Sequence, residues 1–382
     1  MNILVSFHTP VNAGYAMAKL ERTFYDVMVE ICGSAENVFF SFTKYNGEHP
    51  ISLPIEFSNV FELNPLKLNE QKYFGEILNL IKVKNINLAL CFDLQVSGLL
   101  IDVLRKGNVE KVISYWGSTI SSLNSGIKLL FKKIEVLLKQ GKPDLFIFES
   151  ESMRRYATHG RGISINRTKV IPTGVDTEEL KPNVNYKNYV HEIFTIPDER
   201  KVAIYSGHME ERKGVHVIID AFKYLIENIL DNDWHLVVCG NRPGEEQVFL
   251  GMMKDHKALK HVTFAGYRDD LPKILPSCDL GVIASTGWDS FPMSALEMAS
   301  CGLPVLASAL QGLVETIEDK KTGLLFPPGD YKELARLLNE LGKSDNGKLV
   351  EMSIAARKRI LDNLSLNIQK NRLIKTINNL TK

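Results

Sequence analysis

Short apolar segments alternate with longer amphipathic segments along most of the chain. In the first half the apolar segments are residues 3–7, 38–42, 88–92, 112–115, 145–148 and 169–171. Three stretches between them, residues 69–82, 96–105 and 127–140, have the spacing of helices. Continuous apolar strands joined by helices are typical of a parallel sheet that is covered on both faces. Ligands of such sheets bind outside the carboxyl ends of the strands.

The same alternation resumes in the second half of the chain, where the expected strands are residues 201–207, 234–239, 261–265, 280–284 and 304–307. Between the halves, residues 177–200 are polar and are interrupted by Pro182 and Pro197, a composition typical of an interdomain linker. The sequence therefore predicts an α/β protein with a first domain over residues 1–176 and a second over residues 201–360.

The composition is that of a globular protein. Of the 382 residues, 45% are hydrophobic and 24% are charged, which is ordinary. The formal net charge of +1 argues against a nucleic-acid binder. The five cysteines form no CxxC pair, which indicates core residues in a reducing compartment. Without a signal-peptide pattern or an apolar run of ~18 residues, we expect a cytoplasmic protein.

The segment 279–308 is organised as strand, loop, helix and strand. Gly287 and Pro292 punctuate the loop, and a helix is expected from Met293 to Ser300. The free backbone N–H groups in the first turn of a helix suit a phosphate.

Two carboxylates lie within this segment, Asp289 in the loop and Glu297 on the helix, with seven residues between them. Ionised carboxylates accept hydrogen bonds, and sugars offer many hydroxyl donors. Acids at this spacing are also common on solvated loops and helices. The spacing alone does not decide between the two interpretations.

This segment resembles the carboxyl-terminal signature of family 4 of the retaining glycosyltransferases, the glycosyl transferases group 1. That signature has a loop glutamate and a helix glutamate separated by seven residues, then a helix of small residues and Gly-Leu-Pro-Val. The chain matches the run with one departure, Asp289 in place of the first glutamate. Ile171-Pro-Thr-Gly-Val-Asp176, and Gly207 with Lys213-Gly214, are also similar to the family.

The resemblance implies the GT-B fold, in which two Rossmann-like domains face across a cleft and a terminal helix, here residues 361–382, returns to the first domain. It also implies a retaining glycosyltransferase that moves a sugar from a nucleotide-sugar donor to a carbohydrate, lipid-linked or small-molecule acceptor. No metal and no cofactor are expected, because the nucleotide-sugar is itself a substrate.

The resemblance further implies roles for particular residues. Lys213, helped by Arg212 or His208, would neutralise the diphosphate, Asp289 would bind sugar hydroxyls and Glu297 would bind the ribose. Lys213, Asp289 and Glu297 are the expected catalytic residues. The expected donor-binding residues are Gly207, His208, Arg212, Lys213, Gly240, Tyr267, Arg268, Asp289, Phe291, Met293, Ser294 and Glu297.

The first domain is similar to the family only in outline. Gly14 and Tyr15, after the first strand, and Trp116, after the strand at 112–115, are expected to bind the acceptor. Trp116 stands near a place where many relatives have a histidine that contacts the C6 hydroxyl of the donor sugar. This suggests either a donor without that hydroxyl or a tryptophan that stacks on the acceptor.

Departures from the family pattern at Asp289, His208 and Trp116 leave alternatives open. The main one is a non-catalytic partner subunit or acceptor-binding module. A nucleotide-sugar epimerase or a phosphorylase on the same fold is a second.

Residues 125–142 and the motif Asp231-Asn-Asp233 each allow two interpretations. The first has an apolar helical face with lysines beside it: either a domain helix with a solvated basic face or a surface helix that docks on anionic lipid at the inner membrane face. The motif has the form of a metal-binding pair but precedes a strand, so we expect a turn. Histidines and cysteines do not cluster with ligand spacing, so no metal is predicted.

Overall fold

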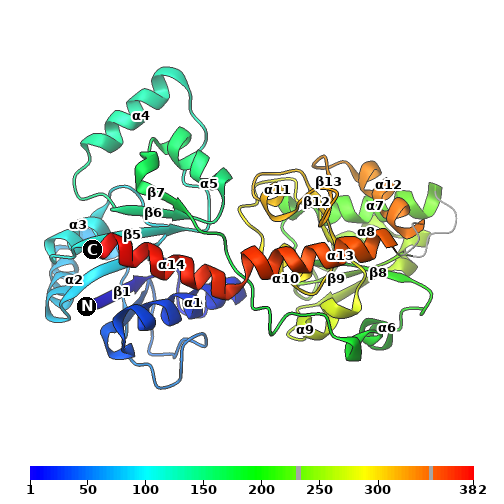
Figure 1. The fold of residues 1–382 in the computed structure, drawn as a ribbon, viewed down its shortest axis with the longest axis horizontal. Helices are drawn as coiled ribbons and strands as arrows, with labels where there is room; N and C mark the ends of the chain where they lie inside the picture. The colour runs from blue at the N-terminus through cyan, green and yellow to red at the C-terminus, as the bar shows by residue number, and fades with distance from the viewer. Residues whose placement is uncertain (229–233, 344–346) are drawn as a thin grey trace. The chain divides into compact units, whose positions relative to one another are not determined.

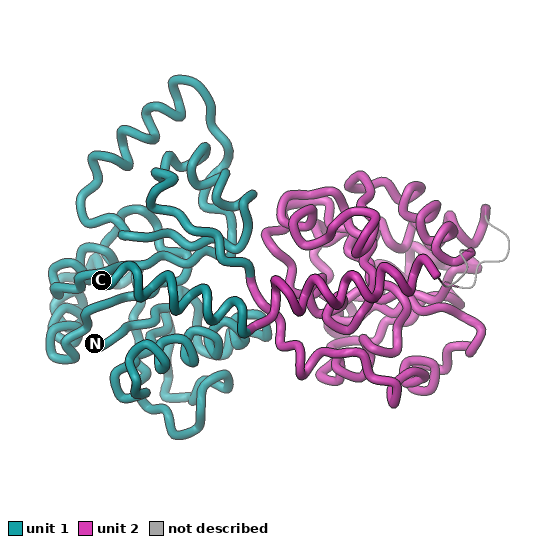
Figure 2. The backbone as a smooth tube through the Cα atoms, in the orientation of Figure 1, with its two compact units in different colours: residues 1–172, 367–382 teal, residues 173–366 magenta. Residues whose placement is uncertain are grey.

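The computed structural model describes residues 1–228, 234–343 and 347–382. The motif Asp231-Asn-Asp233 lies outside the described residues. The chain forms two compact units, shown in Figure 2: residues 1–172 with 367–382 (unit 1) and residues 173–366 (unit 2). Each unit contains one parallel sheet with helices around it (Figure 1). Within the described ranges, no helix combines the length and apolar character needed to cross a membrane.

The sheet of unit 1 has seven strands in the order β3-β2-β1-β4-β5-β6-β7. These strands are β1 Asn2–Ser6, β2 Val38–Phe42, β3 Val60–Glu62, β4 Ile86–Phe92, β5 Lys111–Trp116, β6 Leu145–Phe148 and β7 Thr168–Val170. The helices of this part are α1 Tyr15–Cys32, α2 Gln71–Val83, α3 Leu99–Lys106, α4 Gly126–Leu138, α5 Glu151–Tyr156 and α14 Leu366–Thr381. Alternate residues of β1 enter two separate cores, Ile3 and Val5 one and Leu4 the other, so both faces of the sheet are covered.

The carboxyl-terminal helix α14 packs in the core of unit 1. Leu373 and Ile377 are fully buried in the same cluster as Phe24 of α1. Lys370 pairs with Asp26 of α1 at 2.6 Å. Residues from the two ends of the sequence therefore stabilise one core.

The sheet of unit 2 has six strands in the order β10-β9-β8-β11-β12-β13. They are β8 Lys201–Ser206, β9 Trp234–Cys239, β10 Val262–Gly266, β11 Leu280–Ile283, β12 Val305–Ser308 and β13 Gly323–Phe326. The helices are α6 Tyr189–Phe194, α7 Val215–Asn228, α8 Glu246–Met252, α9 Leu271–Ile274, α10 Met293–Ser300, α11 Leu313–Thr316, α12 Tyr331–Lys343 and α13 Gly347–Arg359. Successive strands are added on one side from β8 to β10 and on the other side from β11 onward. The direction of growth therefore reverses between β8 and β11, where ligands of such sheets usually bind.

The segment 177–200, for which the sequence predicts an interdomain linker, contains α6 and groups with unit 2. Three of its apolar side chains, Leu180, Val190 and Ile196, are buried in a core of that unit, whereas Val184 is 89% exposed. Arg357 of α13 donates to the carbonyl oxygens of Thr177 (3.0 Å) and Leu180 (3.0 Å), which fixes the start of the segment.

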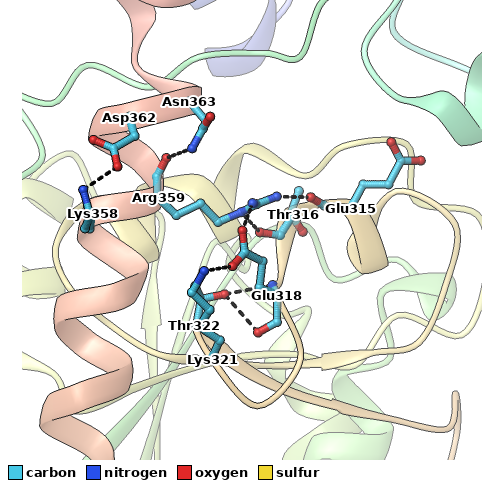
Figure 3. A network of polar contacts seen from close by, with 9 residues as sticks. All are labelled: Glu315, Thr316, Glu318, Lys321, Thr322, Lys358, Arg359, Asp362 and Asn363. Carbon is cyan, nitrogen blue, oxygen red and sulfur yellow. Dashed lines mark hydrogen bonds and ion pairs between the residues drawn. The ribbon is translucent and has the colours of Figure 1, made fainter.

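A second arginine of α13 attaches the end of that helix to α11 and to the loop that follows α11. Figure 3 shows the Arg359 guanidinium among these acceptors: it donates to the carbonyl oxygens of Glu315 (2.6 Å) and Thr316 (3.2 Å) of α11 and pairs with the Glu318 carboxylate of the loop. Lys321 pairs with the same carboxylate at 2.6 Å. The carboxyl-terminal end of α13 is therefore held by two arginines that donate to backbone carbonyls.

Candidate functional site

Two loops meet at the point in unit 2 where the direction of the sheet reverses. One follows β8 and leads to α7, and the other follows β11 and leads to α10. The carbonyl oxygen of Arg212 in the first loop accepts hydrogen bonds from the amides of Thr286 (2.8 Å) and Gly287 (3.2 Å) in the second. The Arg212 side chain also donates to the carbonyl of Trp288 at 2.9 Å. The backbone thus joins the segments that contain Lys213 and Asp289.

Lys213 and Asp289 form a largely buried ion pair across these loops. The Lys213 ammonium lies 3.1 and 3.0 Å from the two carboxylate oxygens of Asp289. The hydroxyl of Ser285 donates to the same carboxylate at 2.7 Å. Because the side chain of Asp289 is 6% exposed and that of Lys213 is 17% exposed, the lysine is the partner that reaches the surface.

Two glycines allow this close approach of the backbone. Gly214 has a φ of +70°, and a Cβ built there would lie 1.8 Å from the carbonyl oxygen of Ala284. Gly240, after β9, has a φ of +108°, and its Cβ would lie 2.2 Å from the carbonyl oxygen of Gly207. A side chain at either position would push the strand-end loops apart.

Helix α10 begins directly after the Asp289 loop. Its cap residue Pro292 makes no side-chain cap hydrogen bond, so the first turn, which includes the amides of Met293 and Ser294, is not capped by that side chain. Phe291 is buried before the helix, and Glu297 is 5% exposed within it. The helix therefore presents backbone donors beside the ion pair, while Glu297 is enclosed.

The other expected donor-binding residues lie at neighbouring strand ends with different partners. His208 is exposed, and its carbonyl accepts from the Tyr205 hydroxyl at 2.6 Å. Arg212 pairs with Glu210 at 2.7 Å, so its positive charge already has a carboxylate partner. After β10, Tyr267 is 72% exposed, and Arg268 is paired with Asp270 at 2.5 Å.

Ser285 and Tyr205 were not predicted from the sequence as residues of this site. Ser285 was visible as a small polar residue directly after an apolar strand, but its bond to Asp289 depends on how the loop turns back. The Tyr205 hydroxyl holds the loop after β8 through the carbonyl of His208. Burial raises the pKa of Tyr205, and the neighbouring Asp289 charge raises it further, so the tyrosine stays neutral.

In unit 1, the structure argues against a ligand-stacking role for Trp116. Its side chain is 2% exposed, and its indole N–H donates to the Ser114 hydroxyl at 2.7 Å inside the unit. The C6-hydroxyl hypothesis, which needed an indole wall facing a ligand, therefore loses its basis. By contrast, Gly14 and Tyr15 at the start of α1 are exposed.

Asp93, directly after β4, was also not predicted from the sequence as a site residue. Its carboxylate accepts from the Gly117 amide at 2.9 Å and from the Ser118 hydroxyl at 3.0 Å. Burial raises its pKa, and these hydrogen bonds and the nearby His8 oppose that rise. Asp93 thereby fixes the loop after β5 beside His8.

Among the described residues, no group of three or more histidine, cysteine, aspartate or glutamate side chains is placed to hold a metal ion.

Residues 187–359 match the family model described as glycosyl transferases group 1. The UDP-Gal:alpha-D-GlcNAc-diphosphoundecaprenol alpha-1,3-galactosyltransferase of Escherichia coli is 24% identical over 64% of this chain and 62% of its own length. The phosphatidyl-myo-inositol mannosyltransferase of Mycobacterium leprae is 30% identical over 46% of this chain and 44% of its own length. The matched regions thus span less than two thirds of either relative.

Solved structures with the GT-B fold resemble the whole chain. Anabaena Alr3699/HepE in complex with UDP has a TM-score of 0.77 at 18% identity, covering 99% of this chain and 100% of its own. A glycosyltransferase from Rickettsia africae has a TM-score of 0.82 at 16% identity, covering 100% of this chain and 99% of its own. This likeness confirms the predicted fold class of two Rossmann-like domains.

Proposed function

We propose that this protein is a retaining glycosyltransferase that moves a sugar from a nucleotide-sugar to a carbohydrate, lipid-linked or small-molecule acceptor, without a metal or cofactor. The observation that supports this most is the Lys213–Asp289 pair beside the N-terminus of α10, inside the domain that matches the family model. A cation, carboxylate acceptors and open backbone amides at one edge of a sheet are the groups that a sugar diphosphate needs.

In this proposal, Lys213 neutralises the diphosphate leaving group, which is the main electrostatic task of the reaction. An ammonium has three N–H donors, so Lys213 can contact a phosphate oxygen while it keeps a bond to Asp289. The amides of Phe291, Met293 and Ser294 bind phosphate or sugar, Asp289 binds sugar hydroxyls, and Glu297 binds the ribose.

The names of similar proteins suggest which donors to test first. The Escherichia coli relative is named for UDP-Gal, and the Anabaena structure contains UDP. We therefore expect a UDP-sugar before a GDP- or ADP-sugar. We also propose a cytoplasmic location with peripheral contact at the inner membrane face.

The test is release of UDP by the full chain from a panel of UDP-sugars, with and without a panel of acceptors. We expect release that depends on an acceptor, that persists in EDTA, and that gives a product with the anomeric configuration of the donor, read by NMR. Loss of activity in EDTA would contradict metal independence, and inversion would contradict retention. Nucleotide binding without turnover on any acceptor would favour the non-catalytic alternative.

A further inference from the structure

Helix α4 of unit 1 presents its apolar face to solvent. About 100° of rotation per residue places six large side chains on an arc of about 120°. They are Ile127, Leu130, Phe131, Ile134, Leu137 and Leu138, with exposed fractions between 43% and 74%. Because soluble proteins rarely leave such a contiguous apolar stripe uncovered, this face is an interaction surface.

The opposite face of α4 attaches the helix to unit 1. Val136 is the one fully buried side chain of the helix. Glu135 pairs with Arg161 at 3.0 Å, and a Cβ at Gly162 would lie 2.7 Å from the backbone of Lys132. Figure 1 shows α4 set apart from the strands of the unit 1 sheet. The helix is therefore fixed with its apolar stripe pointing outward.

The positive charges beside the apolar stripe of α4 indicate the chemistry of its partner. Lys128 and Lys133 are exposed, and the same helical rotation places them on opposite sides of the apolar arc. Neither has an ion-pair partner in the part of the chain that the structure describes. Lysines that flank an apolar helical face can reach phosphate groups while the apolar residues enter the acyl boundary.

We infer that α4 docks unit 1 on the surface of an anionic lipid bilayer, with its axis in the plane of the interface. The inference gives the peripheral membrane contact of the proposed function a lipid class and a set of residues. Docking through α4 does not require glycosyl transfer, so an experiment can contradict the docking without contradicting the proposed activity, and the reverse. A second copy of the chain would cover the apolar stripe but would leave the two flanking lysines facing each other across the interface.

Flotation of the full chain with vesicles tests the inference directly. We expect the protein to float with equal parts of phosphatidylglycerol and phosphatidylcholine, to float far less with phosphatidylcholine alone, and to be released by salt. The double variant Ile127→Glu/Phe131→Glu should stay at the bottom of the gradient. Lys128→Glu/Lys133→Glu should lower the partition coefficient on the order of tenfold or more, since two cations become anions.

Matched controls distinguish docking through α4 from nonspecific adsorption of exposed apolar side chains to vesicles. Val248→Glu and Ile354→Glu remove apolar side chains of unit 2 that are 70% and 64% exposed, and both variants should float like wild type. Circular dichroism and UDP binding, measured on every variant, check folding. No flotation of wild type, equal flotation of the Ile127→Glu/Phe131→Glu variant, or wild-type dimers that this variant dissociates without any lipid binding would each overturn the inference.

Discussion

At the scale of residues, two buried carboxyl groups have contrasting partners. Asp289 accepts hydrogen bonds from the Lys213 ammonium and the Ser285 hydroxyl. Glu21 of α1 is 1% exposed and accepts from the Ser52 hydroxyl, and its Oε1 has no partner among the described residues. Burial raises the pKa of Glu21 to about 7.

The raised pKa of Glu21 predicts that unit 1 loses stability as the pH rises. Between the unfolded pKa of about 4.5 and the folded pKa of about 7 the folded state binds more protons, so the free energy of unfolding falls across this window, by about 3 kcal/mol at most. Glu21→Gln should remove this slope, as measured by urea unfolding between pH 4 and 8. Glu30→Gln, on an exposed position of the same helix, should keep it; equal slopes in wild type and Glu21→Gln would contradict the assignment.

Loss of the Lys213 cation should destabilise unit 2 as well as weaken ligand binding. In Lys213→Met the buried Asp289 keeps only Ser285, and we expect a cost of about 1–3 kcal/mol. Adding Asp289→Asn should recover most of this cost, because the uncompensated charge is gone, but should not restore nucleotide binding. Chemical denaturation of the four proteins of the double-mutant cycle measures the coupling. Additive effects of the two changes would mean that the pair is not energetically linked.

The pair could not be predicted from the sequence as a contact, because its members are 76 positions apart. Lys213, Asp289 and Glu297 were singled out through a family resemblance, not through geometry. Trp116 shows a second limit of prediction from the sequence. It was expected to face a ligand because it lies at a strand end, but its indole points inward and donates to Ser114. Strand-end position is visible in a sequence, whereas the direction of one side chain depends on its packing.

At the scale of elements, the strands of both units were largely predictable, because buried parallel strands are continuous apolar runs. Strand β3 was not predicted, because it has only three residues, all half-buried, at the edge of the sheet. For residues 177–200, the polar composition with Pro182 and Pro197 predicts a linker. The buried side chains Leu180, Val190 and Ile196 are too dispersed to show a helical or strand period. Loops that join elements are the part of the site with the weakest sequence signal.

The junction of the loops after β8 and β11 can be tested at Gly214. Gly214→Ala combines an unfavourable φ with a clash against the carbonyl of Ala284. Gly329→Ala is the matched control, because Gly329 has a φ of +80° and nothing within 4 Å of its Cβ. We expect a cost of about 1–2 kcal/mol for the control, from backbone strain alone, and a clearly larger cost plus lost nucleotide binding for Gly214→Ala. Equal costs in thermal unfolding would show that the loops are not tightly joined.

At the scale of the whole molecule, the chain returns from unit 2 to complete unit 1. The sequence suggested this helix only through the family resemblance, since the charged segment 361–382 has no local signal for its partner. Its packing depends on Leu373 and Ile377 meeting residues of α1 from the other end of the chain. Contacts between segments so far apart in the sequence cannot be predicted from hydrophobic periodicity, which reports only on local structure.

Leu373→Ala should therefore destabilise unit 1 by about 2–5 kcal/mol, the usual cost of a cavity in a core. Amide hydrogen exchange should show lost protection in β1 and β4, while β8 and β11 of unit 2 stay protected. Asn371→Ala, on an exposed position of α14, is the control and should change neither. Equal loss of protection in both units would contradict the assignment of α14 to unit 1.

The central claim is that unit 2 binds a nucleoside diphosphate beside Lys213 and the N-terminus of α10, and calorimetric titration with UDP, GDP and ADP tests it most directly. We predict that one nucleotide, expected to be UDP, binds wild type. Binding should be lost in Lys213→Met and kept in Lys223→Met, which removes a cation from α7 whose ion-pair partner Asp220 is on the same helix. If no nucleotide binds, or if Lys213→Met binds as well as wild type, the site described here is not a donor site.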